Sequence, residues 1–440
     1  MGIADQIREA GVVGAGGAGF PTHVKVSGNA DIVLANGAEC EPLLRTDRHI
    51  MEQYPERIIL GVNAVMESVG ASCGVICVKK KNSKAIEALE RAIGTLSNLR
   101  VYPMDNYYPA GDEQQIVYEV TGKVVPTGGI PLDVGAVVAN VSTLMNVADA
   151  LEGKPLTEKY VTVSGKVKHP ITVKVPIGTP VSALINAADG PDTMSGYTLI
   201  IGGPATGKIC TDWNEPVQKT TGGVLVFKSD HPLIKQKTKD DSLEYKLAKS
   251  VCCQCNMCTQ LCPRHKLGLR VEPHKIMRTV FTGNADLLGD TNGIFSCCDC
   301  GLCSYYACNF GLNPSRMMTQ MKSGLVNSGV KPVKRVGGSV SSSQDIIKVP
   351  AKRLMARMGI LKYDTDTTFI DNDLGVREVC VPLRMHIGVP SVPVVKQGDK
   401  VKKGQLIADI PAKGLGAKIH ASIDGQVKKI TDNAITIKAQ

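Results

Sequence analysis

The chain has 440 residues, enough for about three domains and a small fourth one, and 43% of them are hydrophobic, as in an ordinary soluble protein. Aromatic residues make up only 4%, which argues against a nucleic-acid binder built on base stacking, and the formal charge of +10 is spread along the chain, which favours a solvated basic surface over a docking field for an acidic partner. There is neither an apolar run of membrane-spanning length nor an N-terminal export signal, so we expect a cytoplasmic protein.

A glycine-rich loop at positions 14–19 follows a short predicted helix over residues 3–9. Its sequence, GAGGAG, fits G-x-G-x-x-G, but a dinucleotide-binding loop of the Rossmann type needs a buried strand before it and a helix after it. Here only two valines precede the glycines, and Phe20-Pro21 follows at once. Four glycines in six residues also exceed what one structural turn needs. We therefore predict that bare backbone at Gly14, Gly16, Gly17 and Gly19 lies against a flat, phosphorylated ligand.

The next predicted elements are the strands of an α/β sheet, each followed by polar residues. The strand at 32–35 runs into NGAECEP, which places Glu39 and Glu41 where carboxylates commonly accept the hydroxyls of a ribose or ribityl chain. The strand at 74–78 runs into three lysines that begin at Lys79, and these suit either contact with a phosphate or a solvated strand end.

Two later segments complete this predicted domain. YPAGDEQ, at 108–114, opens a helix that reaches residue 120, and Asp112 and Glu113 suit the first turn of that helix because its N-terminus carries positive partial charge. Residues 137–143 run from a strand directly into another helix. Residues 156–230 then read as a strand pair, a helix and a further strand, which is a β-grasp pattern. No ligand-binding constellation is visible in it, which favours a structural spacer.

Ten of the fifteen cysteines fall between Cys252 and Cys308, which indicates metal ligation in a reducing compartment. The first run has the bacterial ferredoxin spacing C-x2-C-x2-C-x3-C-P if Cys253 is left out. The second run keeps the first two intervals, but its fourth cysteine follows after four residues and lacks the proline. Structural zinc sites also use C-x2-C pairs, yet four-cysteine runs at this spacing favour iron–sulfur clusters over zinc.

In two-cluster ferredoxins the fourth cysteine of each run binds the other cluster. This rule predicts two [4Fe–4S] clusters and leaves Cys253 and Cys298 without a ligand role. One cluster is expected on Cys252, Cys255, Cys258 and Cys308, and the other on Cys297, Cys300, Cys303 and Cys262. Residues 264–295, between the runs, have helical periodicity and extend the ferredoxin unit into an α-helical module.

The rest of the chain reads as a linker followed by a small all-β domain. Residues 326–375 contain a Gly/Ser-rich stretch and a basic helix at 352–361. From residue 379 onward, short strands alternate with Gly-containing turns, as in the barrel-sandwich hybrids that carry lipoyl or biotinyl groups. The flanks of Lys413 do not match a carrier lysine, so a docking module is favoured.

Four motifs together, GAGGAGFPTHVK, NGAECEP, YPAGDEQ and ANVSTL, make the chain resemble the flavin- and NADH-binding subunit of respiratory complex I. With the paired cysteine runs, it is more similar still to the family that comprises the C component of the Rnf complex and the cobalamin reductases of propanediol-utilisation microcompartments. The resemblance covers nearly the whole chain. The C-terminal position of the barrel resembles that in the cobalamin reductases rather than that in the Rnf protein, and some electron-transfer proteins of amino-acid reductases share it.

The resemblance implies FMN held by the loop at 14–19, and NADH stacked over the flavin near Phe20. The expected cofactor-binding residues are Gly14, Gly16, Gly17, Gly19, Phe20, Asn36, Glu39, Glu41, Lys79, Asn140 and Thr143. Two departures stand out, namely Cys40 where complex I flavoproteins have glycine, and the longer spacing before Cys308. The first leaves the NADH contacts less firmly indicated than those of FMN.

These observations predict a multidomain α/β protein with five segments. They are an FMN/NADH domain at 1–152, a β-grasp domain of the soluble-ligand-binding type at 153–235, a dicluster ferredoxin domain at 236–325, a linker with a helix at 326–375 and a barrel-sandwich hybrid at 376–440. No residue is assigned an acid–base role.

The expected function is an NADH oxidoreductase that passes electrons through FMN and two [4Fe–4S] clusters to cobalamin, with the interior of a bacterial microcompartment as a candidate location. The alternative is an electron-transfer subunit that docks on a partner such as an amino-acid (proline) reductase or an Rnf-like complex. A homo-oligomer is compatible with either function. A scaffold that has lost its cofactors is disfavoured by the complete glycine loop and the eight spaced cysteines.

Overall fold

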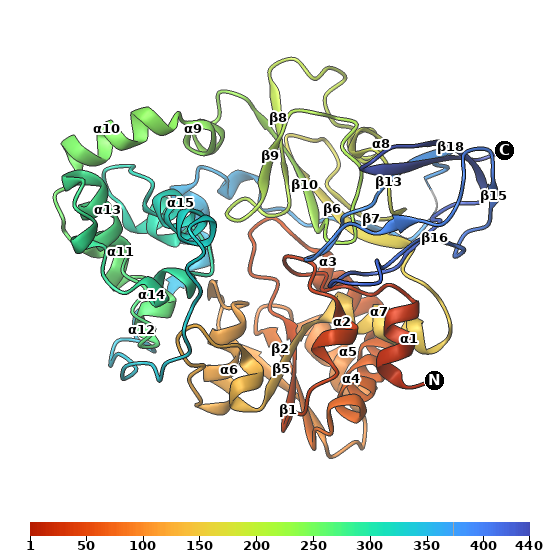
Figure 1. Cartoon of the computed structure of the whole chain (residues 1–440), viewed down its shortest axis with the longest axis horizontal. Coiled ribbons are helices and arrows are strands. Elements are labelled where there is room, and N and C mark those ends of the chain that lie inside the picture. The colour runs from red at the N-terminus through yellow and green to blue at the C-terminus, as the bar shows by residue number, and fades with distance from the viewer. Residues whose placement is uncertain (373) are drawn as a thin grey trace.

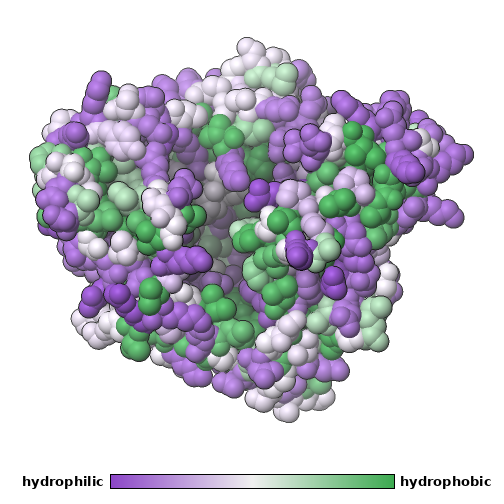
Figure 2. All heavy atoms as spheres, viewed as in Figure 1, coloured by the Kyte–Doolittle hydropathy of each residue, from purple (hydrophilic) through white to green (hydrophobic). Residues whose placement is uncertain are grey.

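The computed structural model describes residues 1–372 and 374–440; position 373 of the predicted linker lies outside the described residues. Four folded units are arranged around the centre of the view in Figure 1, and the space-filling view in Figure 2 shows that this face is hollowed there. Among the described residues, none of the helices combines the length and the apolar character that a membrane crossing requires.

The N-terminal unit is built on a parallel sheet of four strands in the order β3-β2-β1-β5. Its strands are β1 (Ile32–Gly37), β2 (Cys73–Lys79), β3 (Leu99–Met104) and β5 (Ala136–Asn140). Both faces are buried, as the near-continuous apolar sequences of parallel strands require. On β1, Val33 and Ala35 face one core, and Leu34 faces the other.

Helices cover the two faces unequally (Figure 1). The first core lies under α1 (Ile3–Glu9), α3 (Thr46–Gln53), α4 (Pro55–Val69), α5 (Ser83–Ile93) and α7 (Val141–Leu151). The second core receives α6 (Glu113–Thr121). Two short elements, α2 (Thr22–Lys25) and β4 (Tyr107–Tyr108), complete the unit. Because all four strands are parallel, their carboxyl ends meet at one edge, where ligands of open α/β sheets bind.

The close crossing of α4 and α7 fixes the start of α7 at that edge. A Cβ atom built on Gly61 would lie 2.0 Å from the carbonyl oxygen of Leu144, so only glycine permits this approach. Since α7 begins directly after Asn140, the crossing also positions the residues that end β5.

The β-grasp unit has a six-stranded sheet in the order β12-β7-β6-β10-β8-β9. Its elements are β6 (Glu158–Gly165), β7 (Ile171–Pro176), α8 (Val181–Ala187), β8 (Tyr197–Ile201), β9 (Lys208–Cys210), β10 (Gly223–Lys228) and β12 (Thr368–Ile370). The expected strand pair, helix and strand are present. The edge strand β12, however, comes from the segment expected to be a linker.

That segment packs on the other units along much of its length. Its strand β11 (Val349–Pro350) pairs with β4 of the N-terminal unit, and α16 (Ala351–Arg357) buries Leu354 and Met355 in a core shared with the β-grasp unit. The same core contains Leu302 and Tyr305 of the cysteine-rich unit, so the segment contacts three units.

The cysteine-rich unit is helical, as the periodicity between the runs predicts. Its helices are α10 (Asp241–Val251), α11 (Met257–Gln260), α12 (Pro263–Lys266), α13 (Pro273–Thr282), α14 (Thr291–Phe295) and α15 (Pro314–Asn327), and α9 (Pro232–Thr238) leads into it. A π-helical turn, η3 (Cys303–Ala307), lies within the second cysteine run, directly before Cys308. The core beneath the cysteines is formed by Leu267, Leu269, Ile276 and Met318, among others.

The C-terminal unit consists of two small antiparallel sheets, β13-β19-β18-β15 and β14-β16-β17, around one core. The strands are β13 (Glu378–Pro382), β14 (Val392–Pro393), β15 (Lys400–Val401), β16 (Leu406–Asp409), β17 (Ile419–His420), β18 (Gly425–Ile430) and β19 (Ala434–Lys438). Lys219 of the β-grasp unit ties it to the rest, because its buried ammonium donates to the carbonyls of Gly11 (2.6 Å) and Lys418 (2.7 Å).

We predict that Gly61→Ala destabilises the protein, although alanine is the better helix former. The added methyl group would collide with the backbone of α7, and overpacking of this kind costs about 1–3 kcal/mol. The matched control is Gly324→Ala in α15, where nothing lies within 4 Å of the new Cβ, so propensity alone raises stability by up to about 1 kcal/mol. Thermal unfolding midpoints of the two variants check this, and a midpoint for Gly61→Ala at or above wild type would contradict it.

Candidate functional site

The glycine-rich loop is a closed hairpin at the carboxyl edge of the parallel sheet. Gly14 N–H donates to the carbonyl of Phe20 at 2.9 Å, and Val13 pairs with Pro21 across the base. Ala15 N–H donates to Oγ1 of Thr143 at 2.9 Å, which fixes the loop to the first turn of α7. The tip of the loop is exposed.

The glycines of the loop have different surroundings. A Cβ on Gly16 would lie 3.1 Å from the side chain of Asn140, whereas nothing lies within 4 Å of one on Gly17. Gly19 has φ +77°, and its Cβ would meet Thr220 at 2.9 Å and the carbonyl of Met385 at 3.0 Å. Gly16 and Gly17 therefore expose bare backbone beside Asn140, with open space at Gly17, while Gly19 is needed for packing against the β-grasp and barrel units.

The side-chain amides of Asn36 and Asn140, at the ends of β1 and β5, hold this edge in place through hydrogen bonds. Asn140 caps α7 by accepting from Ser142 N–H at 2.9 Å, and its Nδ2 donates to Asp47 at 2.7 Å. Asn36 donates to the carbonyl of Gly111 at 2.9 Å. Asp47 was not singled out from the sequence, since a lone aspartate at the start of a helix gives no sign that it holds a distant strand end.

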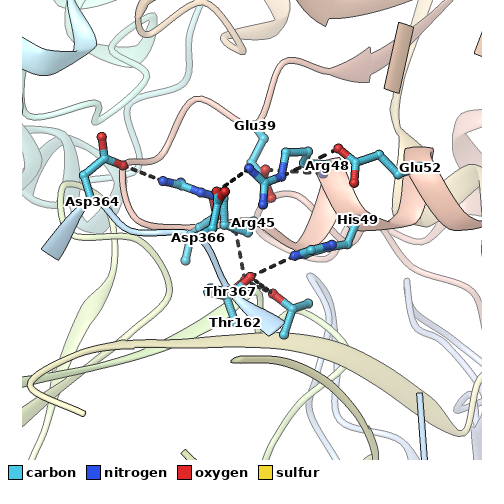
Figure 3. A network of polar contacts seen from close by, with 11 residues as sticks. Glu39, Arg45, Arg48, His49, Glu52, Thr162, Asp364, Asp366 and Thr367 are labelled. Carbon is cyan, nitrogen blue, oxygen red and sulfur yellow. Dashed lines mark hydrogen bonds and ion pairs between the residues drawn. The ribbon is translucent and has the colours of Figure 1, made fainter. Parts of the chain in front are cut away.

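Glu39 caps the start of α3. Its carboxylate accepts from the N–H groups of Asp47 at 2.6 Å and Arg48 at 3.3 Å. Burial raises the pKa of Glu39, and the nearby carboxylate of Asp47 raises it further. Figure 3 shows the polar network around it, in which Arg48 also pairs with Asp366 at 2.7 Å.

Glu41 and Lys79 lie deeper than their positions in the sequence suggest. Glu41 accepts from Ala205 N–H of the β-grasp unit at 3.0 Å and from the hydroxyl of Tyr108 at 3.1 Å. Lys79 is only 2% exposed and makes one long hydrogen bond, 3.5 Å, to the carbonyl of Glu39. Burial lowers the pKa of Lys79 to about 8. Lys79 is the last residue of β2 and so lies at the same carboxyl edge as Asn36 and Asn140, while Phe20 is half-buried at the base of the loop.

The cysteines of the two runs are all free thiols and fall into two neighbourhoods. Burial raises the pKa of Cys258 to about 12, and the thiols that add to this shift are Cys308, Cys252 and Cys255. Burial likewise raises the pKa of Cys303, and the thiols that add to this shift are Cys297, Cys262 and, from the first neighbourhood, Cys258.

The second neighbourhood contains a small cavity whose lining includes the four predicted ligands Cys262, Cys297, Cys300 and Cys303, and also Cys298, which was not predicted as a ligand. Among the described residues, no three potential ligands converge as they would around a single metal ion. A cubane carries four irons and holds its thiolates further apart than one tetrahedral ion does.

The longer spacing before Cys308 is accommodated by the π-helical turn η3. In the first run, Cys258 and Cys262 are connected by the ordinary α-helical turn of α11. In the second, Cys303 and Cys308 are separated by one more residue, and the wider turn over Cys303–Ala307 takes it up. Single π-turns of this kind occur frequently at functional sites.

The segment that joins the sheet edge to the cysteine loops is Tyr108–Gln115. Arg264, directly after Cys262-Pro263, forms a two-pronged ion pair with Asp112 (3.0 and 2.5 Å) and also donates to the carbonyl of Ser296. Tyr108 donates to the carbonyl of Cys300 at 2.7 Å, and Gln115 donates to that of Pro263 at 3.0 Å. The sequence indicated Asp112 only as a helix-start residue and gave no sign of Arg264 as its partner.

Comparison with family models reproduces this division. Residues 7–149 match the Nuo51 FMN-binding domain, residues 160–193 the SLBB domain, residues 251–313 the 4Fe-4S dicluster domain and residues 358–440 the RnfC barrel sandwich hybrid domain.

Among curated proteins, the cobalamin reductase PduS of Salmonella typhimurium is 39% identical over 99% of this chain and 96% of its own length. The chain belongs to the PduS family. The PduS of Citrobacter freundii is 38% identical over the same shares. The C component of the Na(+)-translocating ferredoxin:NAD(+) oxidoreductase complex of Acetobacterium woodii is 37% identical over 61% of this chain and 59% of its own.

Among solved structures, an NAD+-reducing [NiFe]-hydrogenase in the air-oxidized state aligns with 80% of this chain and 66% of its own, at 22% identity and a TM-score of 0.47. As a PduS-family protein, the chain combines an FMN-binding domain with a 4Fe–4S dicluster domain and is a flavin- and iron–sulfur-containing oxidoreductase.

We predict that Arg264→Gln loosens the cysteine-rich unit from the FMN-binding domain. It leaves Asp112 buried without its counter-charge, which costs about 3–5 kcal/mol. Adding Asp112→Asn to this variant removes the unpaired charge and restores part of the stability, as a double-mutant cycle measures. Arg377→Gln, an exposed arginine of the barrel, is the control for loss of charge. Equal denaturant midpoints for Arg264→Gln and Arg377→Gln would contradict the prediction.

Proposed function

We propose that the chain oxidises NADH and passes the electrons through FMN and two [4Fe–4S] clusters to cobalamin. The observation that supports this most is the Tyr108–Gln115 segment, which belongs to the FMN-binding domain and bonds directly to both cysteine loops. The full-length match to proteins named cobalamin reductase supports the choice of acceptor.

In this proposal the sheet edge holds FMN. The open backbone at Gly16 and Gly17 suits contact with the phosphate or ring, and Asn36 and Asn140 stand beside it at the ends of two strands. Thr143 acts by holding the loop, because its hydroxyl accepts a hydrogen bond from Ala15 N–H. The buried ammonium of Lys79 adds positive charge at the end of β2. FMN, when bound, accepts two electrons as hydride and releases them singly, which matches clusters that each take one.

The NADH contacts remain proposed for Phe20, Glu39 and Glu41. An ionised carboxylate has about four acceptor positions, and Glu39 uses two of them on the N–H groups of α3. Room therefore remains for hydroxyl groups of a nucleotide. The ring of Phe20, at the base of the loop, offers a flat surface beside the flavin edge.

Two clusters are proposed on the two cysteine neighbourhoods. One set consists of Cys252, Cys255, Cys258 and Cys308, and the other of Cys262, Cys297, Cys300 and Cys303. The second set lies nearer the FMN-binding domain, because Tyr108 bonds to Cys300 and Arg264 follows Cys262. It would receive electrons first, and the first set would pass them on.

A second candidate function is delivery of electrons to a partner protein. Cys255 is exposed, and beside the first set Met257 and Phe310 expose large apolar side chains. Exposed apolar residues around an electron exit suit a transient protein contact. This acceptor would replace cobalamin without changing the path inside the chain.

Anaerobic stopped-flow spectroscopy with NADH tests the proposal. We expect the flavin absorbance to bleach first and the cluster absorbance to fall afterwards, followed by reoxidation when cobalamin is added. Absence of flavin reduction would refute NADH as donor. Reduction by NADH without reoxidation by cobalamin would favour the partner protein.

We predict that Cys308→Ser lowers the iron content by about half, because it removes one ligand of one four-iron cluster. Cys253→Ser, at an exposed thiol next to Cys252, is the matched control and is expected to keep all of its iron. Iron analysis of both anaerobically purified variants provides the measurement. A full iron complement in Cys308→Ser would show that another group completes the cluster.

A further inference from the structure

A cavity of about 530 Å³ lies where the FMN-binding domain, the β-grasp unit and the barrel meet. Its wall includes Ser142, Met145, Asn146 and Asp149 of α7, the chain that leads into β6, and Lys403-Gly404 of the barrel. Thr143, by contrast, faces the glycine loop from another side of α7. The cavity is therefore separate from the proposed FMN edge, and its volume falls within the range of small-molecule sites.

Most charged groups in the wall neutralise one another. Arg57 pairs with Asp149 and with Glu152, and Lys154 pairs with Glu152 at 2.7 Å. Two further pairs, Lys174 with Asp371 at 2.6 Å and Lys403 with Glu158 at 2.8 Å, complete the set. These charges need no ligand to balance them.

Three side chains in the wall differ from these. Lys159 is 5% exposed, Asn146 8% and Thr157 7%, yet no side-chain hydrogen bond or ion pair is made by any of them within residues 1–372 and 374–440. An unpaired polar group that is withdrawn from water costs free energy, and a charged one costs more. Burial accordingly lowers the pKa of Lys159 to about 8, and the carboxylate of Asp47 opposes this shift.

The three unpaired groups are an ammonium, an amide and a hydroxyl, which together supply hydrogen-bond donors and one full positive charge. A neutral or cationic ligand would leave Lys159 with the carboxylate of Asp47, which forms no ion pair with it, as its opposing charge. An oxyanion would satisfy all three groups at once, and charge-assisted hydrogen bonds of this kind are the strong ones. Ile50, Met145 and Leu156 provide apolar wall for the rest of such a molecule.

We propose that this cavity binds a small organic anion whose carboxylate or phosphate group is held by Lys159, Asn146 and Thr157. The site does not depend on the identity of the electron donor or acceptor. It draws its residues from two units, which explains why the β-grasp sequence alone shows no ligand-binding constellation.

The test uses the protein saturated with FMN, so that the flavin site is filled, and three probes: inorganic phosphate, glycerol 3-phosphate and succinate. Isothermal titration calorimetry and the shift of the unfolding midpoint measure binding. We expect at least one probe to bind wild type at millimolar concentration or below and to raise the midpoint. A preference for either phosphate probe over succinate, or the reverse, identifies the anion class.

Lys159→Met keeps the length of the side chain and removes its charge, and we expect it to weaken binding by about 10- to 100-fold. Lys84→Met, at an exposed lysine of α5, is the matched control and is expected to bind as wild type does. If Lys159→Met fails to fold, Asn146→Asp decides instead, because it keeps the shape of the wall and repels an anion. Failure of all three probes to bind wild type, or unchanged binding in the variant that folds, would overturn the proposal.

Discussion

The guanidinium of Arg264 lies between the carboxylate of Asp112 and the carbonyl of Ser296, and this contact fixes the cysteine loops to the edge of the parallel sheet. Both charges are buried, so the pair is favourable only with the two-pronged geometry and the extra carbonyl acceptor that it has here. Since Arg264 follows Cys262 and Ser296 precedes Cys297, one side chain sets the position of both cysteine runs. Tyr108 and Gln115 add two hydrogen bonds from the same segment.

Buried and half-buried lysines recur where the units of this protein meet. A lysine that donates to backbone carbonyls has a structural role, whereas one without such partners is a candidate for ligand binding. Lys219 donates to two backbone carbonyls and so joins the β-grasp unit to the FMN-binding domain and the barrel. Lys237 donates to the carbonyls of Ala205 and Gly207. Lys159 is also buried but has no such acceptor within the part of the chain that the structure describes. A buried cation that makes no hydrogen bond or ion pair within the described residues, and interacts with the carboxylate of Asp47 only at longer range, is best explained by a ligand that pairs with it.

The elements that the sequence predicted well are those fixed by local pattern. The buried strands at 32–37 and 73–79, the helix after Asn140 and the helical character of the cysteine-rich unit follow from hydrophobic periodicity and helix-start residues, which act over a few positions. The two proposed sets of cysteines rest on the two-cluster ferredoxin rule, in which the fourth cysteine of each run binds the other cluster, and they remain a prediction. The π-turn before Cys308 could not be predicted, since an extra residue can equally form a loop.

The sequence by itself therefore determined the order of the domains, the family, and the residue types available for FMN and iron–sulfur binding. Only the tertiary structure decided which of these residues face the proposed binding sites and which hold the domains together. In the tertiary structure Gly19 packs between units, Glu39 accepts hydrogen bonds at the start of α3, and Glu41 accepts a hydrogen bond from the β-grasp unit. The tertiary structure also paired Arg264 with Asp112 and surrounded Lys159 with residues from a different domain. The physical reason is that hydrogen bonds and ion pairs between residues more than 100 positions apart depend on how the domains dock, and no local pattern in the chain encodes that geometry.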